Sequence, residues 1–141
     1  MKRTSTDGDV PIVLIVDDDP ESLLLVSTMV EYIGYRPVTA STFDETRELL
    51  EQCPAALVLD LVMPEHTSER IVTLLQETSN TLPVVLMSAA MRGRLGAQAA
   101  NYARLGVNVV STLAKPFWID VLVTALEQAI PDAPAGAITS S

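Results

Sequence analysis

The stretch Ile12-Val-Leu-Ile-Val-Asp-Asp-Asp-Pro20 decides the fold of this chain. Its five apolar residues are mostly β-branched, and a run this short is typical of a strand that is buried on both faces. The run stops at three aspartates, Asp17, Asp18 and Asp19. Asp19 before Pro20 is typical of a helix start, with the aspartate as N-cap and the proline in the first turn. The stretch therefore predicts a buried strand, a polar edge and a helix in succession.

The same succession is expected five times along the chain. Short apolar runs predict the strands, and apolar residues at helical spacing between them predict the helices. The expected strands span residues 12–17, 35–40, 55–60, 83–88 and 107–113. The expected helices span residues 20–33, 43–52, 68–77, 95–105 and 118–130. This alternation predicts a doubly wound α/β fold with a parallel five-stranded sheet, helices on both faces and the flavodoxin-like strand order 2-1-3-4-5.

Polar side chains follow four of the predicted strands. Asp17 and Asp18 follow the first strand, Asp60 ends the third, Ser88 ends the fourth and Lys115 follows the fifth. The carboxyl ends of parallel strands share one edge of a sheet, which is where ligands bind in such folds. We therefore expect the carboxylates, the hydroxyl and the amine to converge. Three carboxylates with one amine predict a site for a phosphate group and a divalent cation.

Length, composition and charge narrow the class of protein. The chain has 141 residues and 48% hydrophobic content, which predicts one domain with a sizeable core. We place this domain at residues 10–131 and expect residues 1–9 and 132–141 to be disordered tails. The net charge of −9 disfavours direct binding to DNA or RNA, whose backbones are anionic.

The cysteine content and the hydropathy of the sequence indicate the cellular compartment in which the protein is expected. The only cysteine, Cys53, cannot form an internal disulfide, and its place near a predicted helix end suggests a small packing residue. No run of eighteen apolar residues is present, so no membrane span is expected. Residues 1–9 lack the apolar segment of a signal peptide. These features predict a cytoplasmic protein that does not bind membranes.

Four short motifs together resemble the receiver domain of two-component response regulators, the CheY-like family. The motifs are Val16-Asp17-Asp18-Asp19, Asp60-Leu61-Val62-Met63-Pro64, Leu86-Met87-Ser88-Ala89 and Lys115-Pro116-Phe117. The resemblance implies a phosphoacceptor signalling domain that catalyses only its own phosphorylation and dephosphorylation. It implies a histidine kinase or a histidine phosphotransfer protein as phosphodonor, and a downstream protein partner that the sequence does not identify.

The resemblance also assigns roles to individual residues. Asp60 would be the phosphoacceptor. Mg²⁺ would be held by Asp60, by Asp18 directly, by Asp17 mostly through water and by the backbone carbonyl of Val62. Lys115 and Ser88 would contact phosphoryl oxygens, and the Lys115–Pro116 peptide bond is often cis in this family. Asp19 is expected to act as the helix cap, not as a ligand.

The chain departs from the family pattern at positions that affect signalling. Ser88 and Thr112 occupy the two switch positions, but receivers usually carry an aromatic residue where this chain has Thr112, so the switch is expected to be altered or absent. The segment between Ser88 and Lys115 is long, and residues 65–68 contain no glycine. Val62 and Ala90 offer no side chain to orient an attacking water molecule, so we expect a slowly hydrolysed phosphoaspartate. His66, the only histidine, is expected to be a surface loop residue.

Other interpretations remain open at this stage. Thr112 and the long fourth loop favour an interaction module of the same fold that binds a partner without phosphorylation. Asp17-x-Asp19 superficially fits a phosphohydrolase of the haloacid dehalogenase type, although Pro20 and the shortness of the chain argue against it. A homodimer through the fourth predicted helix, the fifth strand and the fifth helix is a further expectation from the resemblance.

Overall fold

The computed structural model describes residues 10–89 and 92–131. Its centre is a parallel five-stranded sheet of order β2-β1-β3-β4-β5, which confirms the predicted strand order. The strands are β1 (Ile12–Val16), β2 (Arg36–Ala40), β3 (Ala56–Asp60), β4 (Val84–Ser88) and β5 (Val109–Ala114). The central strands β1, β3 and β4 are almost wholly buried, which explains their continuous apolar sequences.

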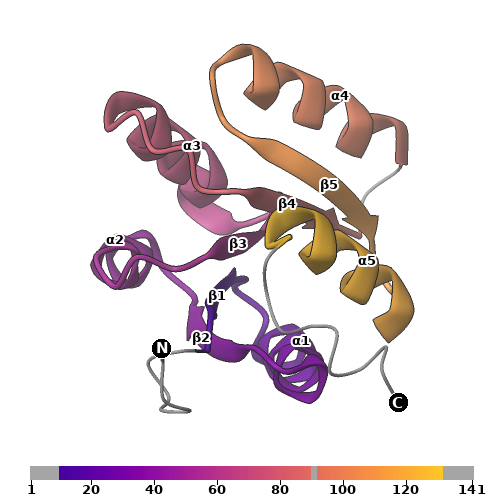
Figure 1. The fold of residues 1–141 in the computed structure, drawn as a ribbon. Coiled ribbons are helices and arrows are strands. Elements are labelled where there is room, and N and C mark those ends of the chain that lie inside the picture. Colours follow the sequence, from indigo (N-terminus) through magenta and orange to yellow (C-terminus); the bar gives the residue numbers. More distant parts are fainter. Residues whose placement is uncertain (1–9, 90–91, 132–141) are drawn as a thin grey trace.

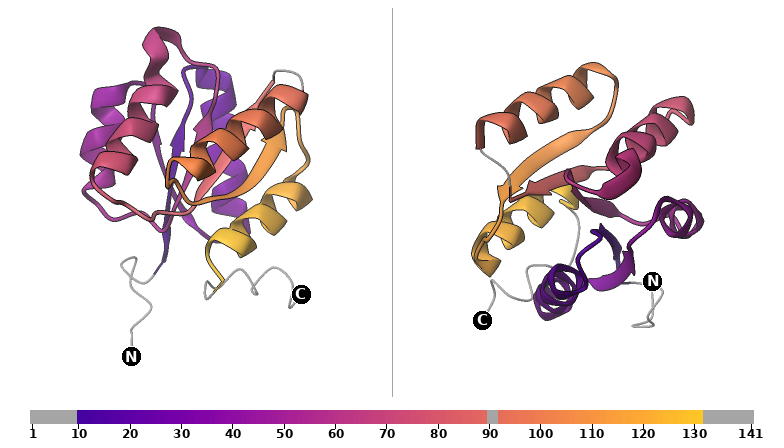
Figure 2. Two further views of the ribbon diagram at one scale, coloured as in Figure 1. Left: turned by 90° about the horizontal axis from the view of Figure 1, so that it is seen from above. Right: turned by 180° about the vertical axis from the view of Figure 1, so that it is seen from behind.

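Helices cover both faces of this sheet (Figures 1 and 2). One face packs against α1 (Pro20–Ile33) and α5 (Ile119–Ala129), and the other against α2 (Phe43–Leu50), α3 (Thr67–Glu77) and α4 (Arg92–Arg104). Successive residues of a strand point to opposite faces, so Val13 and Ile15 enter the first core and Leu14 and Val16 enter the second. Among the described residues, no helix has both the length and the apolarity needed to cross a membrane.

Strands β2, β3, β4 and β5 begin one or two residues later than the sequence predicts. For β2 and β5 the reason is that the preceding helix uses the backbone of the expected first residue. Gly34, at φ 118°, follows α1, and the Tyr35 N–H donates to a carbonyl of that helix at 3.1 Å, so β2 starts one residue later. Gly106, at φ 95°, follows α4, and the Val107 N–H donates to Tyr102 in the same way. Both are glycine-terminated helix ends in which orphan carbonyls are satisfied by the next residues.

Side-chain exposure corrects one further expectation. Cys53 is exposed in the turn after α2 at φ 55°, so it is not a packing residue of the core. In α5, Leu122 and Ala125 are buried and Val121 is 43% exposed, in line with a helix that packs one face on the sheet. The predicted disorder of residues 1–9 and 132–141 lies outside the described part of the chain.

The connection from β3 to α3 has an unusual backbone. A single 3₁₀ turn, η2 (Pro64–His66), precedes α3. Both Glu65 (φ 59°) and His66 (φ 55°) adopt the left-handed conformation, which L-residues other than glycine adopt at a cost of about 1–2 kcal/mol each. The His66 side chain is exposed, as expected for a surface loop residue. Because this connection follows Asp60 directly, its conformation determines what surrounds that carboxylate.

Candidate functional site

Three aspartates converge at the carboxyl edge of the sheet. Asp17 and Asp18 follow β1, and Asp60 is the last residue of the adjacent strand β3. One carboxylate oxygen from each of the three lies within 4.8 Å of the others. Asp17 and Asp60 are buried, whereas Asp18 is exposed at the rim. The strand order brings the three together, because only neighbouring β1 and β3 place residues 17–18 beside residue 60.

Lys115 bridges the two buried aspartates from the end of β5. Its Nζ lies 2.5 Å from Asp17 Oδ2 and 3.4 Å from Asp60 Oδ2. Its backbone N–H donates to the carbonyl of Ser88 at 2.8 Å, which ties the ends of β4 and β5 together. The Lys115–Pro116 peptide bond is cis, as the resemblance implied. We call Asp17, Asp18, Asp60 and Lys115 the acid site.

The two buried carboxylates have opposite pKa shifts. Burial, followed by the adjacent carboxylate of Asp17, raises the pKa of Asp60 to about 6, although Lys115 and the Val62 N–H act in the opposite direction. Burial also acts on Asp17, but hydrogen bonds from Lys115, from Ser22 and from the Asp19 N–H outweigh it and lower the pKa of Asp17. Asp17 therefore favours the ionised state more strongly than Asp60, whose negative charge is less fully compensated.

The remaining predicted residues lie at different distances from this centre. The Val62 N–H donates to Asp60 Oδ1 at 3.2 Å, so the backbone of residue 62 adjoins the phosphoacceptor candidate. Ser88 is buried at the end of β4, one strand away from Asp60, and it lines a recess of about 190 Å³ with Leu61 and Val62. Ala90, the other position expected to influence hydrolysis, lies outside the described residues.

Thr112 does not line the acid site. It is exposed on β5 and borders a separate hollow of about 560 Å³ between α4 and α5. The same hollow is bordered by Leu95, Trp118 and Val121, and Trp118 is 82% exposed. The switch pair expected from the resemblance is thus split between two places, Ser88 buried at the end of β4 next to the acid site and Thr112 on the outer face.

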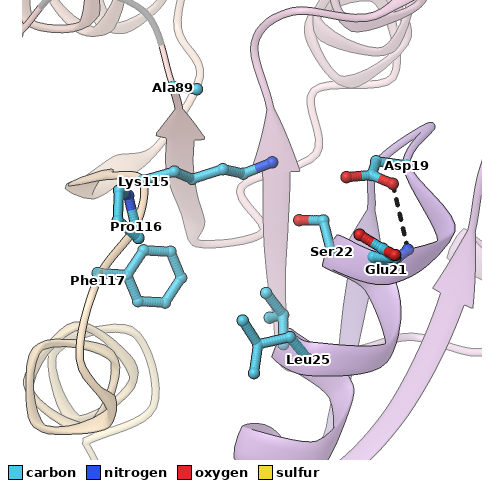
Figure 3. A pocket seen from close by; sticks show the side chains of 9 residues that line it. Asp19, Glu21, Ser22, Leu25, Ala89, Lys115, Pro116 and Phe117 are labelled. Carbon is cyan, nitrogen blue, oxygen red and sulfur yellow. Dashed lines mark hydrogen bonds between the residues drawn. The ribbon is translucent and has the colours of Figure 1, made fainter.

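A second hollow of about 400 Å³ opens directly beside the acid site (Figure 3). Lys115 extends across it toward α1, and Leu25 and Phe117 form its apolar part. Ser22, in the first turns of α1, lines it and hydrogen-bonds Asp17. Sequence reasoning missed Ser22 and Leu25, because a serine and a leucine in a predicted amphipathic helix carry no signal of their own.

Comparison with known proteins connects this geometry to a family. The family model described as the response regulator receiver domain matches residues 13–127. The transcriptional regulatory protein PrrA of Mycobacterium tuberculosis is 32% identical over 118 residues, covering 83% of this chain and 48% of PrrA. The sensor histidine kinase RcsC of Salmonella typhimurium is 28% identical over 125 residues, covering 88% of this chain and 13% of RcsC. The chain therefore spans about half the length of PrrA and a small part of RcsC.

Solved structures show the same fold. A response regulator receiver domain protein from Clostridium thermocellum superposes with a TM-score of 0.73 at 22% identity, covering 86% of this chain and 95% of the other. The chemotaxis response regulator CheY4 of Vibrio cholerae superposes with a TM-score of 0.72 at 20% identity, covering 85% and 98%. With a matching family model over residues 13–127 and an acidic pocket at the end of β1 and β3, this chain belongs to the family of response regulator receiver domains.

Proposed function

We propose that this receiver domain accepts a phosphoryl group on Asp60, with Mg²⁺ as cofactor, from a phosphohistidine of a histidine kinase or a histidine phosphotransfer protein. The observation that carries the proposal is the acid site itself, in which three carboxylates lie within 4.8 Å and one lysine contacts the two that are buried. Asp60 is the proposed acceptor because it lies at the centre of the group and because Lys115 neutralises it less closely than Asp17, at 3.4 Å against 2.5 Å.

The proposed transfer is a single displacement at phosphorus. One carboxylate oxygen of Asp60 forms a bond to phosphorus while the bond from phosphorus to the donor imidazole nitrogen breaks. The electron pair of that bond stays on the imidazole nitrogen, which then takes up a proton. The Val62 N–H at 3.2 Å from Asp60 Oδ1 fixes the orientation of the carboxylate, and the buried hydroxyl of Ser88 would donate to a phosphoryl oxygen.

The donor set of the acid site fits Mg²⁺. Carboxylate oxygens are the ligands that hard divalent cations prefer, and Mg²⁺ commonly binds one or two carboxylates and retains several waters. Asp60 and Asp18 would be direct ligands, Asp17 would bind mostly through water, and the Val62 carbonyl would add a backbone oxygen. When bound, Mg²⁺ neutralises the negative charge shared by the carboxylates and the incoming phosphoryl group. The raised pKa of Asp60 is consistent with this fit, since it arises from burial and then from the neighbouring carboxylate of Asp17, whose repulsion a cation would relieve.

The Lys115 side chain can contact either Asp17 or the incoming phosphoryl group. In the structure its Nζ is closer to Asp17, at 2.5 Å, than to Asp60, at 3.4 Å. It can leave Asp17 for a phosphoryl oxygen once Asp17 has another positive charge nearby. We therefore assign Lys115 to the phosphoryl group in the loaded state and to Asp17 in the metal-free state.

The output surface proposed for this domain is the face formed by α4, β5 and α5. It carries the hollow that Thr112 borders, together with the exposed Trp118 and Val121. A large exposed aromatic at the edge of a surface hollow is typical of a protein contact surface. A downstream protein, or a second copy of this chain, would bind there. The proposal places the domain in the cytoplasm, where the exposed Cys53 stays reduced.

The test is the intact mass of the protein after incubation with acetyl phosphate, with and without Mg²⁺. Wild type should gain one phosphoryl group only when Mg²⁺ is present, and Asp60→Asn should gain none. Asp19→Asn is the matched control, because asparagine also caps helices and Asp19 is expected to act only as the cap of α1, so it should be phosphorylated like wild type.

The alternative function is a receiver-like module that binds its partner without phosphorylation. The position of Thr112 on the outer face, away from the acid site, is the observation that favours it. Absence of a phosphoryl adduct on wild type, together with absence of Mg²⁺ binding in calorimetry, would replace the phosphoacceptor proposal by this one.

A further inference from the structure

We infer that Ser68 is a positioning residue for the phosphoacceptor, and that its hydroxyl holds the Asp60 backbone so that Asp60 and Val62 present their oxygens to the cation. This inference rests on the proposed function of Asp60. The juxtaposition that carries it is a hydrogen bond from the Ser68 hydroxyl to the backbone carbonyl of Asp60, eight residues earlier in the chain.

The bond joins two elements at a fully buried point. Ser68 lies in the first turn of α3 and has no exposed surface. Asp60 is paired with Met87 of β4, but it lies one residue beyond the last pair of β3 with β1, which is Val16 with Leu59. The Ser68 hydroxyl therefore supplies a donor to the Asp60 carbonyl where the pairing with β1 has stopped.

The hydroxyl does not act as a helix cap. The N-cap of α3 is His66, which makes no side-chain cap hydrogen bond. Thr67 and Ser68 instead donate to carbonyls of the preceding segment, Thr67 to Pro64 at 2.7 Å and Ser68 to Asp60. A capping side chain would accept from helix N–H groups, so these two hydroxyls brace the β3–α3 connection and leave the helix terminus without a side-chain cap.

The connection needs such bracing because its backbone is unfavourable. Glu65 and His66 are both left-handed, and residues 65–68 include no glycine that would adopt this conformation at low cost. Strained residues persist only where the surroundings fix them. Three hydrogen bonds provide that constraint. The hydroxyls of Thr67 and Ser68 donate from the residues after the strained pair, and the Leu61 N–H donates to the Met87 carbonyl at 2.9 Å before it.

The backbone conformation of the β3–α3 connection determines where the Asp60 carboxylate lies in the acid site. The Asp60 carboxylate is oriented by the Val62 N–H at 3.2 Å, so any shift of the backbone between the two residues moves the carboxylate. The proposed cation ligands include both that carboxylate and the Val62 carbonyl. Partners that orient metal ligands typically change metal affinity or activity by about 10–100-fold when removed. Loss of the Ser68 hydroxyl should therefore weaken Mg²⁺ binding.

The experiment compares Ser68→Ala with a matched control, both in the 141-residue chain. Thr46 in α2 is also fully buried, and its hydroxyl donates to a backbone carbonyl, that of Thr42, at 2.8 Å. Thr46→Val removes this hydrogen bond on another element. Both variants should lose thermal stability to a similar extent. Calorimetric titration with Mg²⁺ should show a dissociation constant about tenfold higher for Ser68→Ala and within twofold of wild type for Thr46→Val.

A second measurement follows the metal-free protein. Hydrogen exchange at the amides of Leu61 and Val62 should be faster in Ser68→Ala than in wild type or in Thr46→Val. Ser68→Cys has a side chain of similar size but a weaker donor, so its Mg²⁺ affinity and amide exchange rates should lie between those of wild type and Ser68→Ala. This variant also keeps the test possible if Ser68→Ala does not fold.

The outcomes separate the two proposals. If wild type binds no Mg²⁺ and takes up no phosphoryl group, the phosphoacceptor function is wrong. If wild type binds Mg²⁺ but both Ser68 variants match Thr46→Val in Mg²⁺ affinity and in amide exchange, then Ser68 only stabilises the fold and the inference is overturned.

Discussion

At the scale of single residues, the charge balance around Asp60 governs the behaviour of the metal-free domain. Asp60 is buried beside the carboxylate of Asp17, and Lys115 lies closer to Asp17 than to Asp60. One lysine is thus shared unequally between two buried acids. Val62 also belongs to the surroundings of Asp60, because its backbone N–H donates to Asp60 Oδ1 while the residue itself is 61% exposed.

The pH dependence of stability follows from the raised pKa of Asp60. With a folded pKa of about 6 against an ordinary value of 3.8, the folded state binds the Asp60 proton more tightly than the unfolded chain does. This contribution to the free energy of unfolding is therefore present below about pH 4, declines as pH rises to about 6 and is absent above. The lowered pKa of Asp17 acts in the opposite direction at lower pH, since its contribution is lost as pH falls through its folded pKa.

Asp60→Asn should accordingly stabilise the metal-free protein at pH 7.5, by about 2 kcal/mol, and flatten the decline between pH 4 and 6. Urea denaturation in the presence of a chelator at several pH values measures both effects. Asp120→Asn, an exposed acid in the first turn of α5, is the control, and it should not stabilise the protein at pH 7.5 or flatten the decline between pH 4 and 6. A variant Asp60→Asn that is less stable than wild type at pH 7.5 would contradict the assigned crowding.

The lifetime of the phosphoaspartate is a second residue-scale property. The Val62 side chain is 61% exposed beside the acid site and cannot hydrogen-bond a water molecule. We expect the phosphorylated protein to persist for many minutes, and Val62→Asn to shorten its lifetime severalfold by orienting a water. The decay of the phosphorylated species is followed by intact mass after removal of acetyl phosphate, with Val62→Ala as the control that adds no polar group. A wild-type lifetime of only seconds would show the expectation to be wrong.

At the scale of elements, the β3–α3 connection and the β4–β5 strand pair carry the departures from a regular fold. The connection contains two left-handed residues before α3, and β5 pairs with β4 through a register shift between Val84 and Val85. These irregular elements lie beside the acid site and on the proposed output face. The buried strands β1 and β3, which position the acids, are regular throughout.

Relief of the left-handed strain should stabilise the domain. Glu65 is exposed at φ 59°, ψ 29°, so Glu65→Gly should raise the free energy of unfolding by up to about 1 kcal/mol, the relieved strain less the entropy that glycine adds to the unfolded chain. Glu48→Gly, in the exposed interior of α2, should lower it by about 1 kcal/mol. Chemical denaturation of both variants provides the comparison, and equal destabilisation would rule out strain at residue 65.

At the scale of the whole molecule, the proposed cation binding would be coupled to folding. The acid site draws its ligands from the ends of β1 and β3 and from the segment after β3, so it exists only when the sheet is assembled. A cation that binds the folded chain and not the unfolded chain raises the free energy of unfolding by mass action.

Mg²⁺ should therefore stabilise the wild-type domain by about 1.4 kcal/mol at ten times its dissociation constant. Thermal unfolding at increasing MgCl₂ measures this gain, with NaCl of equal ionic strength as reference. Asp18→Asn should lose most of the gain, whereas Glu21→Gln, an exposed acid in the first turn of α1, should retain it. A Tm that does not change with Mg²⁺ would count against a cation at this site.

Much of the fold could be predicted because it depends on local pattern and on general rules of chain topology. Short apolar runs such as residues 12–16 can be buried only as strands of a sheet covered on both faces, and alternation with helices dictates parallel pairing. The convergence of Asp17, Asp60, Ser88 and Lys115 at one edge followed from the same rules. The starts of β2 and β5 lie one and two residues later than predicted. The reason is that the glycine-terminated ends of the preceding helices use the N–H groups of the residues that follow.

The sequence by itself determined the sheet order and the set of polar residues at its carboxyl edge, because strand periodicity and crossover handedness leave few alternatives. Only the tertiary structure decided that Lys115 bonds Asp17 more closely than Asp60, that Ser68 donates to the Asp60 carbonyl and that Thr112 lies on the outer face. Those contacts join residues from different elements, and their geometry depends on how the elements pack in space, which no local pattern in the chain encodes.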